Sequence, residues 1–145
     1  MEINLSPDHL RAIEAHGEST YPNEGAGFLL GVLEGNAVQV SHLLPIDNKR
    51  EAEAQYNRYE LSPQDFARAE LEADKQGISL VGVFHSHPDH PARPSEFDRD
   101  HAWPNFTYLI TSVEKDKAKV TTAWRLRPDR TAFDEDTIKL TEVSG

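Results

Sequence analysis

The 145-residue sequence contains no cysteine. This absence excludes disulfides, thiolate zinc sites, iron–sulfur clusters and a cysteine nucleophile. A metal site in this protein must therefore use histidine and carboxylate side chains, and seven histidines are available. The lack of cysteine also fits a cytoplasmic protein, which is the location that we predict.

Positive charge is scarce in the sequence. Lys and Arg number 15 against 25 Asp and Glu, which gives a formal net charge of −10. This charge argues against a protein that binds nucleic acid by neutralising phosphates and against one that docks on an anionic membrane. We interpret the acidic excess as a solvated surface.

Long apolar runs are also missing. The longest apolar stretch is Gly25 to Leu33, about half of the roughly 20 residues that a membrane-spanning helix needs. The start, Met1 to Asn4, lacks the basic and apolar regions of a signal peptide. The length suits one domain, and no repeat or linker divides the chain, so we predict a single domain over residues 1–145.

Ser-Pro pairs mark the expected helix starts, because serine caps a helix N-terminus and proline fits its first turn. Ser6-Pro7 predicts a helix that ends near Gly17, and Ser62-Pro63 predicts one that ends at Gly77. A shorter helix begins at Ser95 and reaches Trp103 at most.

Apolar and alternating segments predict the strands. Gly25–Leu33 is apolar on both faces and rich in glycine, which indicates a buried central strand that other backbone approaches closely. The turn 34–36 joins it to a partner strand, Pro45–Asn57 is a surface loop, and Arg58–Leu61 could form a short strand. Further strands are expected at Ala37–Leu44, Ile78–Phe84, Phe106–Val113, Ala118–Leu126 and Thr131–Val143. The order predicts a mixed α/β domain with a single curved mixed β-sheet flanked by helices.

The stretch with chemical content begins at the end of the strand 78–84. It reads His85-Ser86-His87-Pro88 and, after six residues, Ser95-Glu96-Phe97-Asp98. Alternation along a strand places His85 and His87 on one face and Ser86 on the other. With Asp98 folded back toward the strand end, two imidazoles and one carboxylate make a metal-ligand set that leaves a position open, which is the composition of a catalytic zinc site.

Each part of this pattern has an ordinary interpretation. A His-x-His pair is usually a surface feature, and Ser95 with Asp98 also reads as a helix capping box. Glu24 beside Pro22 and Asn23 reads as a solvated turn carboxylate. Taken together, however, the strand-end histidines and the Ser-x-x-Asp are far more specific than either piece.

The whole string resembles the motif of the JAMM (MPN+) metalloproteases, His-x-His-Pro-x6-Ser-x-x-Asp, with every defined position present. That family also has a glutamate before an apolar strand, and Glu24 fits this place. Relatives often carry a cysteine soon afterwards, where this chain has Gly25 and Ala26. The resemblance covers about residues 5 to 125 and is strongest to compact prokaryotic members.

The resemblance implies a JAB1/MPN, cytidine-deaminase-like fold and one Zn²⁺ held by His85, His87 and Asp98. It implies that zinc polarises the scissile carbonyl and acidifies a water. Glu24 would act as general base for that water, and Ser95 would donate a hydrogen bond to the oxyanion.

The function implied by the resemblance is hydrolysis of the amide or isopeptide bond after the C-terminal Gly-Gly of a small β-grasp protein, either ubiquitin-like or a sulfur carrier. An extended tail of this kind could add as a strand to an exposed sheet edge. Two alternatives stay open: a non-catalytic MPN interaction module, and a RadC-like JAB protein associated with DNA, which the negative charge disfavours. The sequence leaves room for a homodimer.

Three further histidines and one tryptophan lie near the motif or along the first helix. We expect His90 to be solvated, while His101 is either a second-layer group behind Asp98 or an ordinary helix-face residue. His9 has no evident partner, and we expect Trp103 to belong to the core.

Overall fold

The computed structural model describes residues 1–46 and 61–141. Within these residues the chain forms three helices, α1 (Pro7–Thr20), α3 (Pro63–Gln76) and α4 (Glu96–His101). The strands are β1 (Glu2–Leu5), β2 (Ala26–Glu34), β3 (Ala37–Ile46), β4 (Ser79–Pro88), β5 (Thr107–Glu114), β6 (Lys117–Leu126) and β7 (Phe133–Leu140). The mixed α/β class predicted from the sequence is confirmed.

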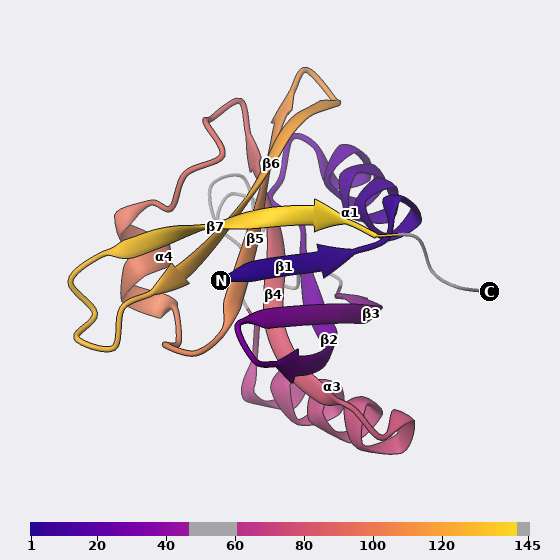
Figure 1. The fold of residues 1–145 in the computed structure, drawn as a ribbon. Coiled ribbons are helices and arrows are strands. Elements are labelled where there is room, and N and C mark those ends of the chain that lie inside the picture. The colour runs from indigo at the N-terminus through magenta and orange to yellow at the C-terminus, as the bar shows by residue number, and fades with distance from the viewer. Residues whose placement is uncertain (47–60, 142–145) are drawn as a thin grey trace.

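The strands form one mixed sheet that closes on itself in the order β1-β3-β2-β4-β5-β6-β7. Most neighbours are antiparallel, but β4 runs parallel to β5, and β1 runs parallel to both β3 and β7. Figure 1 shows β1 between β7 and β3, where it joins the two ends of the sheet. The curvature expected from the sequence therefore goes as far as a closed barrel.

The expected helix starts are present, with serine at each N-terminus. The Ser6 hydroxyl accepts a hydrogen bond from the His9 amide at 3.0 Å, and Ser62 and Asp65 form a reciprocal capping box. Helix α3 ends at Gly77 in the left-handed conformation, as predicted. Helix α1 continues to Thr20, beyond the predicted stop, because Gly17 is a buried position against Ser86 of β4 and not a cap.

Strand β2 is buried through its first six residues and is closely approached by other backbone, as its glycines indicated. A Cβ atom on Gly31 would overlap the carbonyl oxygen of Gln39 in β3. The register between β2 and β3 shifts between Leu30 and Gly31. Glycine is required here because the bulge brings two backbones together.

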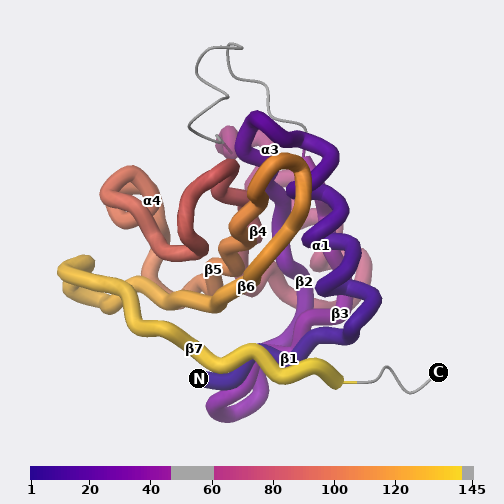
Figure 2. The backbone as a smooth tube through the Cα atoms, turned by 90° about the horizontal axis from the view of Figure 1, so that it is seen from above, coloured from indigo at the N-terminus to yellow at the C-terminus, as the bar shows by residue number. Residues whose placement is uncertain are grey.

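Alternate residues of the central strands supply two core clusters. Phe84, Leu29 and Leu109 pack with Ile13 of α1, while Val83 and Phe28 pack with Ala69 of α3. In Figure 2, α1 and α4 lie on opposite sides of β4 and β5. Side chains at every second residue of a strand lie on the same face, so His85 and His87 are on the face of β4 that carries Val83. This is the face away from α1.

Two further expectations about local structure were wrong, and one strand was not predicted at all. Strand β1 was missed, because four residues are too few to show a pattern. Pro45 and Ile46 belong to β3 and not to a loop. Trp103 is 58% exposed and lies outside the core.

Other sequence expectations fall partly outside the described residues. Most of the proposed loop 45–57 and of the proposed strand 58–61 lies there. Within residues 1–46 and 61–141, no helix is both long and apolar enough to cross a membrane.

Candidate metal centre

The two histidines lie on a strand that is held along both edges. Beside them, β4 pairs with β2 as far as His85 and with β5 as far as Pro88. Both side chains are buried, and their ring centroids lie 5.1 Å apart. Strand alternation thus presents two neighbouring imidazoles from a rigid platform, as the spacing predicted.

Asp98 comes to the same place from the first turn of α4. Its Oδ2 lies 3.1 Å from Nε2 of His87, and its Oδ1 lies 3.8 Å from Nε2 of His85. Oδ2 also accepts a hydrogen bond from the Ser95 amide at 2.8 Å. The loop after Pro88 therefore folds back as expected, and the helix cap and the candidate ligand are the same carboxylate.

A backbone carbonyl fixes the orientation of the His87 ring. Its Nδ1 lies 2.9 Å from the carbonyl oxygen of Pro91, which can only accept a hydrogen bond. Nδ1 therefore carries the hydrogen, and the lone pair of a neutral ring is on Nε2, facing Asp98. A lone pair and a carboxylate oxygen 3.1 Å apart need a cation between them, either a proton or a metal ion.

The protonation states suit metal binding. Burial lowers the pKa of His85 to about 4, which outweighs the opposite effect of Asp98. Burial alone would raise the pKa of Asp98, but the charge that His85 carries when protonated at low pH and the hydrogen bonds from His87 and Ser95 hold this pKa well below its ordinary value. At neutral pH the site thus contains a neutral His85 imidazole and an ionised carboxylate, the forms that bind metals.

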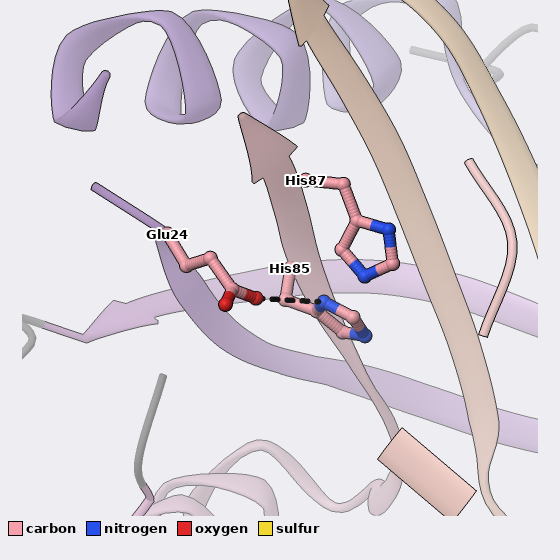
Figure 3. A group of neighbouring side chains, drawn as sticks. All are labelled: Glu24, His85 and His87. Atoms are coloured by element: carbon pink, nitrogen blue, oxygen red, sulfur yellow. Dashed lines mark ion pairs between the residues drawn. The ribbon is translucent and has the colours of Figure 1, made fainter. Parts of the chain in front are cut away.

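Glu24 completes the cluster from the residue pair that precedes β2. It is buried, and its Oε1 lies 3.9 Å from Nδ1 of His85 (Figure 3). Ligand atoms of Glu24, His85 and His87 all lie within 4.8 Å of one another. The interpretation of Glu24 as a solvated turn carboxylate is therefore wrong, because its side chain is buried.

These donors fit a zinc ion. Ligands about 2.0 Å from a tetrahedral zinc lie roughly 3.3 Å from one another. The distances of 3.1 and 3.8 Å from Asp98 to the two Nε2 atoms lie on either side of this value. Asp98 lies near the Nε2 atoms of both histidines, whereas Glu24 lies near Nδ1 of His85, so the cluster contains two carboxylates on different sides of the His85 ring.

Ser95 lies at the N-terminus of α4, where it is exposed. Its hydroxyl oxygen accepts a hydrogen bond from the Asp98 amide at 3.1 Å. Accepting this bond does not use the hydroxyl hydrogen, so the capping role and a donor role toward a substrate are compatible.

Several contacts that hold the site were missed by sequence reasoning. The Ser86 hydroxyl accepts from the amide of Gly25 at 2.8 Å, which ties β4 to the residue after Glu24. The Tyr21 hydroxyl donates to Asp89 at 2.6 Å and so joins the turn before Glu24 to the loop after His87. Ser86 could have been noticed in the sequence as a small polar residue between two histidines. Tyr21 and Asp89 are 68 positions apart, and no local pattern indicates that they meet.

The other candidates stay outside this cluster. His101 is exposed, stacks on Phe97 at 4.0 Å and contacts the Phe97 carbonyl, which makes it a helix-face residue. His90 is exposed, as expected. His9 is half-buried, and the pKa of its imidazole is lowered by burial and by His42.

A mixed sheet with two strand-end histidines and two nearby acidic side chains is consistent with the JAB-domain class that the motif resembles. Residues 6–127 match the family model described as prokaryotic homologs of the JAB domain. The chain belongs to this family, and it is an enzyme of the JAMM peptidase type, as its sequence indicated.

The chain is 36% identical over 117 residues to the desampylase of Haloferax volcanii. The matched region covers 77% of this chain and 81% of that relative. It is 29% identical over 105 residues to a probable TtuB-protein conjugate cleaving protease of Thermus thermophilus. The matched region covers 72% of this chain and 66% of that relative.

Solved structures show the same fold. A protein from Desulfitobacterium hafniense has a TM-score of 0.84 and 31% identity, with 97% of this chain and 94% of that chain covered. A JAB1/MPN domain protein from Archaeoglobus fulgidus has a TM-score of 0.52 and 16% identity, with 96% of both chains covered. The second likeness concerns the fold alone.

Proposed function

We propose that the protein is a zinc-dependent peptidase that cleaves the amide or isopeptide bond after the C-terminal Gly-Gly of a small ubiquitin-like or sulfur-carrier protein. The observation that carries this proposal is the convergence of His85, His87 and Asp98 beside Glu24. We take residues 1–145 to be one catalytic domain.

His85, His87 and Asp98 would hold the metal. When bound, Zn²⁺ supplies Lewis acidity for the scissile carbonyl and makes a water more acidic. The chain's part is to keep the ligands deprotonated and oriented. It does so through burial of His85, the Pro91 carbonyl behind His87 and the Ser95 amide on Asp98.

Glu24 would move the proton. Its carboxylate takes a proton from the attacking water while the water oxygen bonds to the carbonyl carbon, and it delivers that proton to the departing nitrogen as the C–N bond breaks. The Ser95 hydroxyl would donate a hydrogen bond to the oxygen that becomes negative. Glu24 lies beside His85, and Ser95 is hydrogen-bonded to the amide of Asp98, so both side chains are close to the cluster.

The relatives support the substrate class. One is named a desampylase and the other a probable TtuB-protein conjugate cleaving protease. We expect an extended tail to approach the end of β4, where pairing with β2 ends at His85 and the Ser86 amide still bonds to the Gly25 carbonyl. A Gly-Gly tail has no side chains to obstruct such an approach.

A non-catalytic module would not need these residues, and the buried acid–histidine cluster therefore disfavours it. A RadC-like role in DNA association is disfavoured by the net charge of −10. The cytoplasmic location and a homodimer stay predictions.

The direct test uses a synthetic conjugate in which the Gly-Gly tail of a ubiquitin-like protein is linked to a lysine peptide. With zinc present, intact-mass spectrometry is expected to show the free protein and the free peptide, whose masses together exceed that of the conjugate by one water. A chelator abolishes the products and added zinc restores them. Cleavage that continues in chelator would contradict the proposal.

A further inference from the structure

We propose that Arg130 is a positioning residue for the metal centre, because it holds the far end of the helix that carries Asp98. The inference rests on the proposed function, since it concerns how the same site is kept in shape. Arg130 is 32 positions from Asp98 in the sequence and lies in the turn between β6 and β7.

The guanidinium of Arg130 donates three hydrogen bonds to the C-terminal end of α4. Its NH1 group bonds to the carbonyl of Ala102 at 2.8 Å, and its NH2 group bonds to the carbonyls of Arg99 and Asp100 at 3.2 Å each. These are carbonyls of the last turn, which have no partner within the helix. A positive charge at the C-terminal end of a helix also interacts favourably with the helix dipole.

The turn that presents Arg130 is itself well defined. The Arg130 amide donates to the Arg127 carbonyl at 2.8 Å, and Asp129 accepts from the amide and hydroxyl of Thr131 at 3.0 and 2.6 Å. The Arg127 amide closes the hairpin by bonding to the Ala132 carbonyl. The guanidinium is therefore delivered from a fixed position.

Helix α4 needs such support because it has only six residues. A helix of this length has no stability of its own, so its ends decide whether it forms. At its start, the Ser95–Asp98 capping box uses the same carboxylate oxygen that faces His87. Fixing the helix at its other end therefore fixes the distance from Asp98 to both histidines and the direction of Ser95.

The test compares Arg130→Met with Arg127→Met. Both variants lose one positive charge from the same hairpin, but Arg127 pairs with Asp134 and not with α4. Zinc affinity is measured by competition with a chromogenic chelator. Amide hydrogen exchange of residues 98–102 is followed in the metal-free protein, and thermal melting reports the overall fold.

Arg130→Met is expected to weaken zinc binding by about tenfold or more, the usual effect of removing a group that supports a metal ligand. Exchange of the α4 amides becomes faster, while melting changes little. Arg127→Met leaves both readouts unchanged, and Arg130→Lys restores part of the affinity. If Arg130→Met does not fold, Arg130→Lys and Arg130→Gln carry the same comparison.

Zinc affinity in Arg130→Met equal to that of the wild type would overturn the inference while leaving the proposed function intact. Equal weakening in Arg127→Met would also overturn it, because net charge would then be the cause. A wild-type protein that binds no zinc would instead overturn the proposed function.

Discussion

At the scale of single residues, Asp98 has two tasks. One carboxylate oxygen caps α4 through the Ser95 amide and lies 3.1 Å from His87, while the other faces His85. Metal binding and helix formation are therefore coupled at one side chain. A substitution that preserved the cap but not the charge, such as Asp98→Asn, would separate the two tasks.

Burial of His85 makes the metal-free protein sensitive to acid. The folded-state pKa of about 4 lies below the ordinary histidine value of 6.5, so between these pH values the unfolded chain binds a proton that the folded chain does not. This contribution to stability is complete above pH 6.5 and is lost as the pH falls toward 4. The size is roughly 3 kcal/mol by linkage.

Urea unfolding of the chelator-treated protein at several values between pH 7 and 4 measures this loss. His85→Gln should flatten the dependence, whereas His90→Gln, at an exposed position after β4, should keep it. An unfolding free energy that stays constant from pH 6.5 to 4 in the wild type would show that His85 is not buried as described.

Much of the candidate site could be predicted from the sequence, because His85, His87 and Asp98 are close in the chain and two of them alternate on one strand. Glu24 was placed only by resemblance. The contacts that orient these groups, such as Ser86 with Gly25 and Arg130 with α4, depend on how distant segments pack. Local patterns carry no information on such pairs.

At the scale of elements, glycine decides how β2 meets its neighbours. Gly31 lies at the bulge between β2 and β3, against the Gln39 carbonyl. We expect Gly31→Ala to lower the free energy of unfolding by about 2 kcal/mol or more, since the added methyl forces two backbones apart.

Denaturant unfolding of Gly31→Ala checks this prediction. Leu33→Ala, at a position of the same strand that is 61% exposed, serves as the control and should change stability by less than about 0.5 kcal/mol. Similar effects in the two variants would mean that the close approach at Gly31 is not present.

Element starts were easier to predict than element ends. The Ser-Pro pairs identified two helix starts, because a cap is a local interaction. The stop expected at Gly17 was wrong, since that glycine is used for packing against Ser86. Trp103 was expected in the core, but the structure exposes its ring, and its amide donates to the Tyr108 hydroxyl.

At the scale of the whole molecule, β1 closes the barrel. It pairs in parallel with β3 on one edge and with β7 on the other, which joins the beginning of the chain to residues 137–140. Closure of this kind could not be predicted, because parallel pairing between distant segments leaves no turn signature in the sequence.

The closing strand should be important for stability because Ile3 and Leu5 are almost fully buried. Ile3→Ala is expected to cost about 2–5 kcal/mol, the usual range for emptying a buried aliphatic site. Thermal or urea unfolding measures it, with Glu2→Ala, at a neighbouring half-exposed side chain that pairs with Lys139, as the control. A loss in Ile3→Ala as small as in Glu2→Ala would mean that β1 does not seal the barrel.

We propose that a metal held by His85, His87 and Asp98 works with Glu24 as the base. The most direct measurement is the zinc content and the conjugate-cleavage rate of Glu24→Gln, made on one preparation beside the wild type and Glu34→Gln, an exposed hairpin control. We expect about one zinc per chain in all three proteins and a loss of cleavage by at least about 100-fold in Glu24→Gln alone. Cleavage by Glu24→Gln at the wild-type rate, with zinc retained, would contradict it.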